Sequence, residues 1–146
     1  MNVSEELIRS IVEKVLSETA AASSCGCGFE KHVDPSGVLS VKTSTVKLEP
    51  FEGRNDVKLK DVATLEEAPR MGCGIMELTD GADFEWTLTY DEWDIVLEGR
   101  LEIKIDGRVV GGDAGDVIYT PKGSHIHFSP PDHAKYAYTV FPADWQ

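Results

Sequence analysis

The fold is decided by the stretch Gly81–Gly99, GADFEWTLTYDEWDIVLEG, and by Gly115–Phe128, GDVIYTPKGSHIHF, which follows it after a short hairpin. In and around both, apolar and polar residues alternate with a period of two, and Asp-Gly and Pro-Lys-Gly turns separate the alternating runs. Many short strands with no helices between them predict an antiparallel sandwich or barrel, an all-β fold. The expected strands are residues 38–41, 45–49, 57–62, 74–78, 84–90, 93–97, 101–105, 108–110, 117–120, 125–128 and 135–141.

The two stretches resemble the two sequence motifs of a cupin, a jelly-roll β-barrel. In a typical cupin, two metal-binding histidines precede a glutamate by six and four residues, and the second motif supplies another histidine. Aligning Glu92 with that glutamate places Trp86 and Leu88 at the first two histidine positions, and Ile126 at the third. Of the four ligand positions, only Glu92 keeps a metal-binding side chain.

This substitution limits the chemistry of the barrel interior. A transition metal needs several lone-pair donors converging on one point, and indole, leucine and isoleucine side chains offer none. We therefore expect an apolar and acidic pocket with no transition-metal centre, which disfavours dioxygenase and oxidase activity. Trp86, Leu88, Glu92 and Asp94 are expected to share the inward face, with a bend near Tyr90 that resets the alternation.

A closer resemblance covers residues 36–146. The runs FEWTLTYDEWDIVLEGRLEIKIDG, GDVIYTPKGS and VFPADWQ resemble the EutQ family of bacterial ethanolamine-utilisation operons. The resemblance implies a role in a bacterial microcompartment that breaks down ethanolamine. It also implies an acetate kinase activity, which transfers phosphate between ATP and acetate, and association with shell proteins through the N-terminal part.

Phosphoryl transfer needs a cradle for the nucleotide phosphates, carboxylates that hold magnesium and a site for the acceptor. The chain has no Walker A sequence. Glu92 and Asp94, two apart on one expected strand, are the best candidates for magnesium ligands and catalytic carboxylates. The alternative is that Asp94 faces solvent and that Glu92 is a hydrogen-bonded structural residue.

The remaining candidates are weaker. Tyr90 is a catalytic candidate that, like Trp86, could stack on adenine or wall an acetate pocket lined by Leu88 and Ile126, although buried aromatic residues are more often plain core. Lys122, in a Pro-Lys-Gly turn at the barrel rim, could reach a phosphate, or it could be a turn lysine in water. Glu77 is a further substrate-binding candidate.

His125 and His127 form an H-x-H pair on one expected strand, so both rings should lie on one face. Such a pair could bind a metal together with His133 or His32. In the cupin alignment the two histidines flank Ile126 and face away from the cavity. We therefore expect an exterior pair that binds no metal.

The chain before the barrel has a different character. Residues 1–18 show the one-face apolar spacing of an amphipathic helix, residues 19–32 read as a flexible linker, and residues 33–146 form the expected barrel domain. The helix either folds back on the barrel or docks on another protein as a helix in a groove. The resemblance favours a microcompartment shell protein as that partner.

Charge and composition limit the partners. Twenty-six acidic and fourteen basic residues give a net charge of −12, which disfavours nucleic acid and anionic membranes. No apolar run is long enough for a membrane span, so a soluble, cytoplasmic protein is expected. We expect a homodimer with ATP and acetate as substrates and magnesium as the metal. The competing hypothesis is a non-catalytic cargo or assembly protein that binds shell protein or a small ligand.

Overall fold

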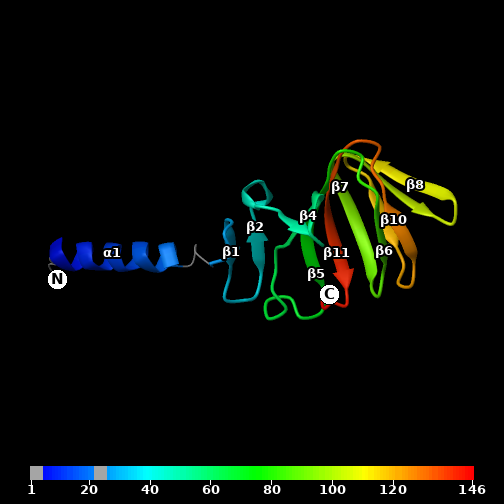
Figure 1. Cartoon of the computed structure of the whole chain (residues 1–146). Helices are drawn as coiled ribbons and strands as arrows, with labels where there is room; N and C mark the ends of the chain where they lie inside the picture. The colour runs from blue at the N-terminus through cyan, green and yellow to red at the C-terminus, as the bar shows by residue number, and fades with distance from the viewer. Residues whose placement is uncertain (1–4, 22–25) are drawn as a thin grey trace. The chain divides into compact units, whose positions relative to one another are not determined.

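The computed structural model describes residues 5–21 and 26–146 (Figure 1). The chain divides into two compact units, Met1–Lys47 and Leu48–Gln146. The first strand of the second unit, β3, begins at Glu49. Among the described residues, no helix is long and apolar enough to cross a membrane.

The first unit contains the expected helix and a small hairpin. Helix α1 spans Glu5–Ala21, and strands β1 (Lys31–Val33) and β2 (Leu39–Val41) pair antiparallel. The apolar side chains Ile8, Ile11 and Val12 of α1 are about half exposed. Of the expected linker, residues 19–32, the first three residues are helical, the last two belong to β1, and residues 22–25 lie outside the described residues.

The strand expected at residues 45–49 is wrong. Thr43–Thr45 forms a short 3-10 turn, η1, and strand β3 begins only at Glu49. The Thr45 hydroxyl donates to the Lys42 carbonyl at 2.8 Å and accepts from the Glu30 backbone N–H at 2.9 Å. Such local side-chain hydrogen bonds compete with strand pairing, which explains the difference.

The second unit is one curled antiparallel sheet. Its central path runs β3-β4-β5-β11-β7-β10-β6, and β8 and β9 also pair with β7. The all-β prediction is therefore confirmed. The strands are β3 (Glu49–Phe51), β4 (Arg54–Asp61), β5 (Gly72–Leu78), β6 (Phe84–Thr87), β7 (Asp91–Ile105), β8 (Arg108–Asp113), β9 (Val117–Thr120), β10 (His125–Phe128) and β11 (Ala134–Phe141).

Strand β7 joins the two halves of the barrel. The sequence predicts two strands here with a turn at Gly99, but the structure has one strand with Gly99 at a positive φ of 71°. The first half of β7 pairs with β11 and β9, and the second half pairs with β8 and β10. Gly99 lies against the His133 carbonyl, where a Cβ would clash. The glycine therefore allows a kink in a continuous strand instead of a turn.

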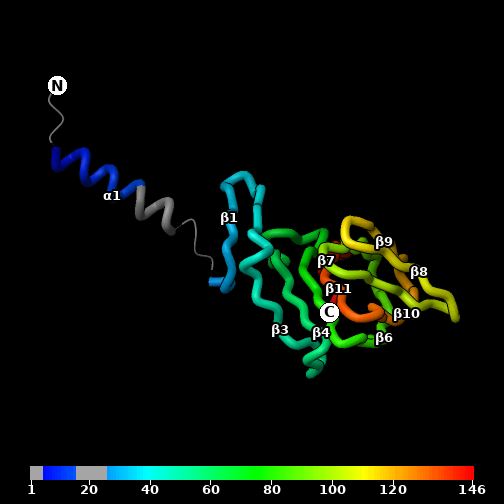
Figure 2. Tube along the Cα trace, turned by 90° about the horizontal axis from the view of Figure 1, so that it is seen from above, coloured from blue at the N-terminus to red at the C-terminus, as the bar shows by residue number. Residues whose placement is uncertain are grey.

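The curl brings the two edges of the sheet together (Figure 2). Arg54 on β4 donates a hydrogen bond of 2.7 Å to the backbone carbonyl of Asp83, which directly precedes β6. The Phe51 and Phe84 rings also meet edge to face, with centroids 5.8 Å apart. No strand pairing joins these two edges of the sheet within the described second unit. Side-chain contacts close the barrel on this side instead.

The core is lined by every second residue. The prediction that Trp86, Leu88, Glu92 and Asp94 share the inward face is confirmed. The predicted reset of the alternation near Tyr90 is wrong. Even-numbered residues stay inward along the whole segment, through the bend between β6 and β7. They are Phe84, Trp86, Leu88, Tyr90, Glu92, Asp94 and Val96, all buried except Trp86, which is half-buried.

Candidate active site

Two acidic side chains, two positions apart on one strand, lie in the interior of the barrel. Glu92 and Asp94 lie on β7 with 5% and 0% of their surface exposed. Strand β11 places Tyr138 opposite Asp94, and β9 places Thr120 opposite Glu92. The expectation that the two carboxyls share the inward face is confirmed, and the alternative of a solvent-facing Asp94 is wrong.

Most of the carboxyl oxygens of this pair lack protein partners. Glu92 Oε1 and both oxygens of Asp94 are buried without a hydrogen-bond donor among the described residues. The two carboxyls are close enough to share a hydrogen bond with each other if one is protonated. Buried polar atoms are costly when unpaired, so the pair requires a proton, a water or a cation.

Burial controls the protonation of the pair. It raises the pKa of Glu92 to about 7, against a smaller opposing effect of the hydrogen bond with Asp94. Burial, together with the nearby charge of Glu92, raises the pKa of Asp94 well above its ordinary value. At neutral pH the pair therefore keeps at least one proton, as expected for two carboxyls that share a site.

Aromatic side chains enclose the space beside Glu92. Trp86 Nε1 donates to the Tyr90 hydroxyl at 2.8 Å, and the Trp145 ring packs edge to face against Tyr90 with centroids 5.9 Å apart. The remaining cavity, which Glu92 and Tyr138 also line, is only about 20 Å³. This is room for about one water molecule.

A larger cleft lies on the other side of Trp145. It measures about 460 Å³ and lies within the range of small-ligand sites. Trp145 lines both the cleft and the interior cavity. Asp61 holds it in place, since its Oδ1 accepts hydrogen bonds from Trp145 Nε1 at 3.3 Å and from the Tyr138 hydroxyl at 2.7 Å. Lys60 and Asp144 also line the cleft.

The structure gathers some predicted site residues and separates others. Leu88 and Ile126 are fully buried core residues, whereas Glu77 lies on the outer face and pairs with His133 at 3.0 Å. Lys122 is exposed in its turn, where its backbone N–H donates to Asp91 at 2.9 Å. Neither Glu77 nor Lys122 lines the cavity or the cleft.

Sequence reasoning missed three residues of this region, namely Lys60, Asp61 and Trp145. Lys60 and Asp61 end a strand that was predicted, but nothing in its pattern indicates a cleft. Trp145 lies within the C-terminal run VFPADWQ, which was recognised only as part of a resemblance. The only available signal was an isolated tryptophan after the last strand, which is too weak to predict a cover for the interior.

The acidic pair fits a hard cation by its chemistry. Magnesium prefers oxygen ligands, and three of the four carboxyl oxygens lack protein donors in the described chain. Magnesium normally keeps several waters, however, and the adjoining cavity holds about one. Glu92 and Asp94 can therefore supply ligands, but a hydrated ion also needs Trp145 or a neighbouring ring to move.

Comparisons with known proteins decide the family. The family model described as "Ethanolamine utilisation protein EutQ" matches residues 3–146. The chain belongs to the EutQ family. A Clostridioides difficile relative named "Acetate kinase EutQ" is 42% identical and the match covers 99% of this chain and 95% of the relative. A Salmonella typhimurium relative of the same name is 37% identical over 97% of this chain, but the match covers only 63% of its own length.

Solved structures support the same family and fold. The structure titled "Structure of the Clostridium difficile EutQ protein" matches with a TM-score of 0.74 and 46% identity, covering 81% of this chain and 98% of that one. The cupin domain of Schizosaccharomyces pombe Cnp3 matches with a TM-score of 0.59 and 16% identity, covering 70% of this chain and 73% of that one. The second likeness concerns the fold alone. The fold of this EutQ-family chain is therefore a cupin, as the resemblance implied.

Proposed function

We propose that this chain is an acetate kinase that transfers phosphate between ATP and acetate with magnesium. The proposal is supported by the name of the relatives, one of which matches along nearly the whole chain. The single structural observation that carries it is the buried pair Glu92 and Asp94 with its unpaired oxygens. Glu92 lines the small interior cavity together with Trp145, which also lines the larger cleft. We also propose that the chain performs this reaction in a microcompartment that breaks down ethanolamine.

In this proposal Glu92 and Asp94 hold the metal. Bound magnesium supplies positive charge that offsets the negative charge of the transferring phosphoryl group. The nucleotide occupies the 460 Å³ cleft, where Lys60 is the residue placed to contact a phosphate. Lys60 now pairs with Glu49 at 2.8 Å and would exchange that exposed partner for the phosphate. Acetate enters beside Tyr90 once the Trp145 ring swings outward.

The assay for this function compares two variants. In protein free of host kinases, the unchanged chain should form ADP from ATP and acetate only when magnesium is present. Glu92→Gln should lower this rate at least about 100-fold, because it removes one of two proposed metal ligands. Glu98→Gln, on the exposed surface beside Lys135, is the control and should keep the full rate. Absence of acetate-dependent ADP from the unchanged chain contradicts the proposal.

The second candidate function is a non-catalytic cargo or assembly protein of the microcompartment. It is favoured by the interior cavity, which at about 20 Å³ admits neither acetate nor ATP without a movement of its walls. It is also favoured by the exposed apolar side chains of α1. In this proposal α1 docks on a shell protein through its apolar face.

The docking proposal predicts a selective loss of shell binding. Changing Ile8, Ile11 and Val12 together to lysine should abolish co-purification with the purified shell protein, since it places three charges in the apolar face. The melting temperature of the barrel should remain within about 1 °C, because surface changes usually leave stability unchanged. Glu6→Lys, which changes charge outside the apolar face, is the control and should still bind. Undiminished binding of the triple variant contradicts docking.

The expected homodimer is also a proposal. The outer face of β7 and β9 carries five exposed apolar or aromatic side chains, 41% to 57% exposed and none of them acidic: Trp93, Ile95, Leu97, Val117 and Tyr119. Asp91 borders this apolar face and accepts a hydrogen bond of 2.9 Å from the Tyr119 hydroxyl. In a chain with a net charge of −12, contact between two copies through a mostly apolar face keeps the repulsion between acidic groups low. We propose that two copies meet on this face.

Light scattering during size-exclusion chromatography tests the dimer. The unchanged chain should have twice the monomer mass, and Ile95→Glu should have the monomer mass, because it would bury an unpaired carboxylate. Val109→Glu, at a similarly exposed valine on β8, should remain dimeric. A monomer mass for the unchanged chain at high concentration contradicts this interface.

A further inference from the structure

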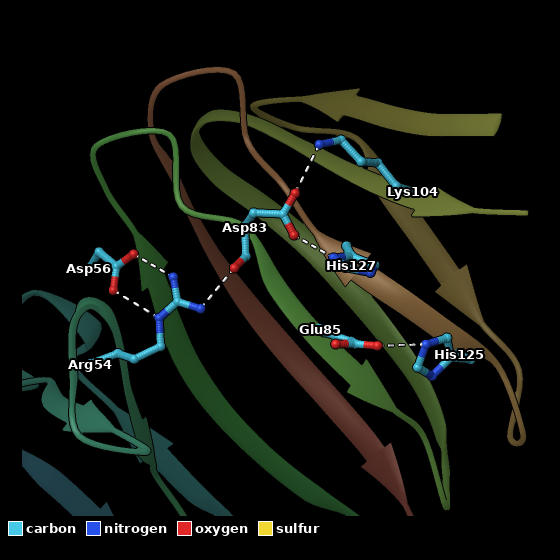
Figure 3. A network of polar contacts seen from close by, with 7 residues as sticks. All are labelled: Arg54, Asp56, Asp83, Glu85, Lys104, His125 and His127. Carbon is cyan, nitrogen blue, oxygen red and sulfur yellow. Dashed lines mark hydrogen bonds and ion pairs between the residues drawn. The ribbon is translucent and has the colours of Figure 1, made fainter. Parts of the chain in front are cut away.

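The outer face of β6 and β10 carries a second group of ionisable side chains, separate from the interior pair. The strands align His125 with Thr87, Ile126 with Trp86 and His127 with Glu85. Ile126 is buried in the core, so the two histidines point outward, as the sequence predicts. Their side chains come to the surface beside that of Glu85 (Figure 3).

Three of these side chains converge. One ligand atom each from Glu85, His125 and His127 can be chosen so that all three lie within 4.8 Å of one another. His125 Nε2 and Glu85 Oε1 are 2.9 Å apart. Ligands of a tetrahedral zinc ion at about 2.0–2.1 Å lie roughly 3.4 Å from each other. The widest separation, at most 4.8 Å, must therefore close by no more than about 1.4 Å, and the 2.9 Å pair must widen by about 0.5 Å. Glu85 and His125, each 61% exposed, have the freedom to make these changes.

The second ring nitrogen of each histidine is already held. His127 Nδ1 bonds to the Asp83 carboxylate, and His125 Nδ1 lies 2.7 Å from the Thr87 hydroxyl. These contacts orient both rings so that the Nε2 atoms are the ones available for a metal. A metal-binding imidazole characteristically has such a carboxylate or hydroxyl partner on its other nitrogen.

The supporting carboxylate is itself fixed, as Figure 3 shows. Lys104 donates to Asp83 Oδ2 at 3.0 Å, and Arg54 donates to the Asp83 backbone carbonyl at 2.7 Å. Arg54 is in turn held by Asp56 at 2.5 Å. Asp83 therefore sits in a network that spans β4, β7 and β10, which makes the position of the His127 ring a property of the fold rather than of one flexible side chain.

The sequence predicts that this exterior pair binds no metal, but the convergence of Glu85 on it changes that expectation. We propose that Glu85, His125 and His127 form a surface site for a divalent first-row transition ion, with zinc as the representative. Two imidazoles and one carboxylate suit zinc, copper or nickel, and do not suit magnesium or calcium, which prefer oxygen ligands alone. The three ligands leave a fourth position for water or a further ligand. The third ligand is Glu85, because its carboxylate is the one that converges with the two histidines. His133, considered from the sequence together with His32, pairs with Glu77 instead.

Calorimetric titration of the full chain with zinc chloride tests the site, using tag-free protein first dialysed against a chelator. The unchanged chain should bind one equivalent of zinc. The double variant His125→Ala/His127→Ala should lose that binding, and Asp83→Asn should weaken it about 10-fold to 100-fold, as expected when the orienting partner of a ligand is removed. His133→Ala should bind as the unchanged chain does.

Two results would overturn the site: no zinc uptake by the unchanged chain, or equal uptake by the double variant. A second measurement needs no variant and so does not depend on folding of the substituted protein. Cobalt(II) added to the unchanged chain should broaden the ring resonances of His125 and His127 in the NMR spectrum and spare those of His133. Broadening of all histidines alike, or of none, would contradict a site at these residues.

Discussion

The unchanged chain is expected to lose unfolding free energy as the pH rises from about 4.5 to about 7, and Glu92→Gln is expected to reduce that loss. Burial raises the pKa of Glu92 to about 7 in the folded state, from 4.5 as the ordinary value. Between these values the unfolded chain releases the proton while the folded chain keeps it, so rising pH favours unfolding. A shift of this size corresponds to about 3 kcal/mol of unfolding free energy.

Urea denaturation at pH 4.5, 6 and 8 measures this effect. The contribution is fully present at and below pH 4.5 and is lost above pH 7, so the unchanged chain and Glu92→Gln should differ most in their slopes between those values. Glu98→Gln, at an exposed position, should follow the unchanged chain. Parallel curves for the unchanged chain and Glu92→Gln would show that Glu92 is not a buried acid.

Trp145→Ala is expected to destabilise the second unit by about 3 kcal/mol, at the lower end of the range for removing a buried aromatic side chain. The indole is 9% exposed and packs against the rings of Phe51, Trp86 and Tyr90 at centroid distances of 5.9 to 6.4 Å. Its loss also opens the interior cavity to the cleft and hydrates Glu92. The pKa of Glu92 should therefore move back toward its ordinary value.

Equilibrium unfolding in urea checks the stability change. Phe141→Ala is the matched control, since this aromatic side chain lies near Trp145 in the sequence but is 56% exposed. Its change should cost less than about 0.5 kcal/mol. Equal losses for the two variants would mean that Trp145 does not act as a cover of the interior.

Much of the barrel could be predicted from alternation and turn chemistry. Strands β9 and β10 have the bounds that the sequence predicts, because turn residues flank each strand and one face of each is apolar. Predictions failed where a local rule was overruled. The pair Glu98-Gly99 has the chemistry of a turn, but in the structure the positive φ of Gly99 serves a kink within β7.

The chemistry of the interior was predictable only in part. The alignment of Glu92 with a cupin ligand, together with the period of two, placed Glu92 and Asp94 on the inward face. The depth of burial and the lack of donors depend on side chains from β9 and β11, which pair with β7 from far along the chain. Likewise, the convergence of Glu85 with the two histidines depends on the register of β6 against β10, which periodicity alone does not give.

The central claim is that the barrel interior encloses the carboxyl pair Glu92 and Asp94, while Trp86, Leu88 and Ile126 occupy the positions where the cupin alignment expects metal-binding imidazoles. Titration of the Glu92 side-chain carboxyl carbon by NMR tests it most directly, with the resonance assigned by its disappearance in Glu92→Gln. We expect a midpoint near pH 7, as burial beside Asp94 requires. A midpoint near pH 4.5, the ordinary pKa of a glutamate, would contradict the account.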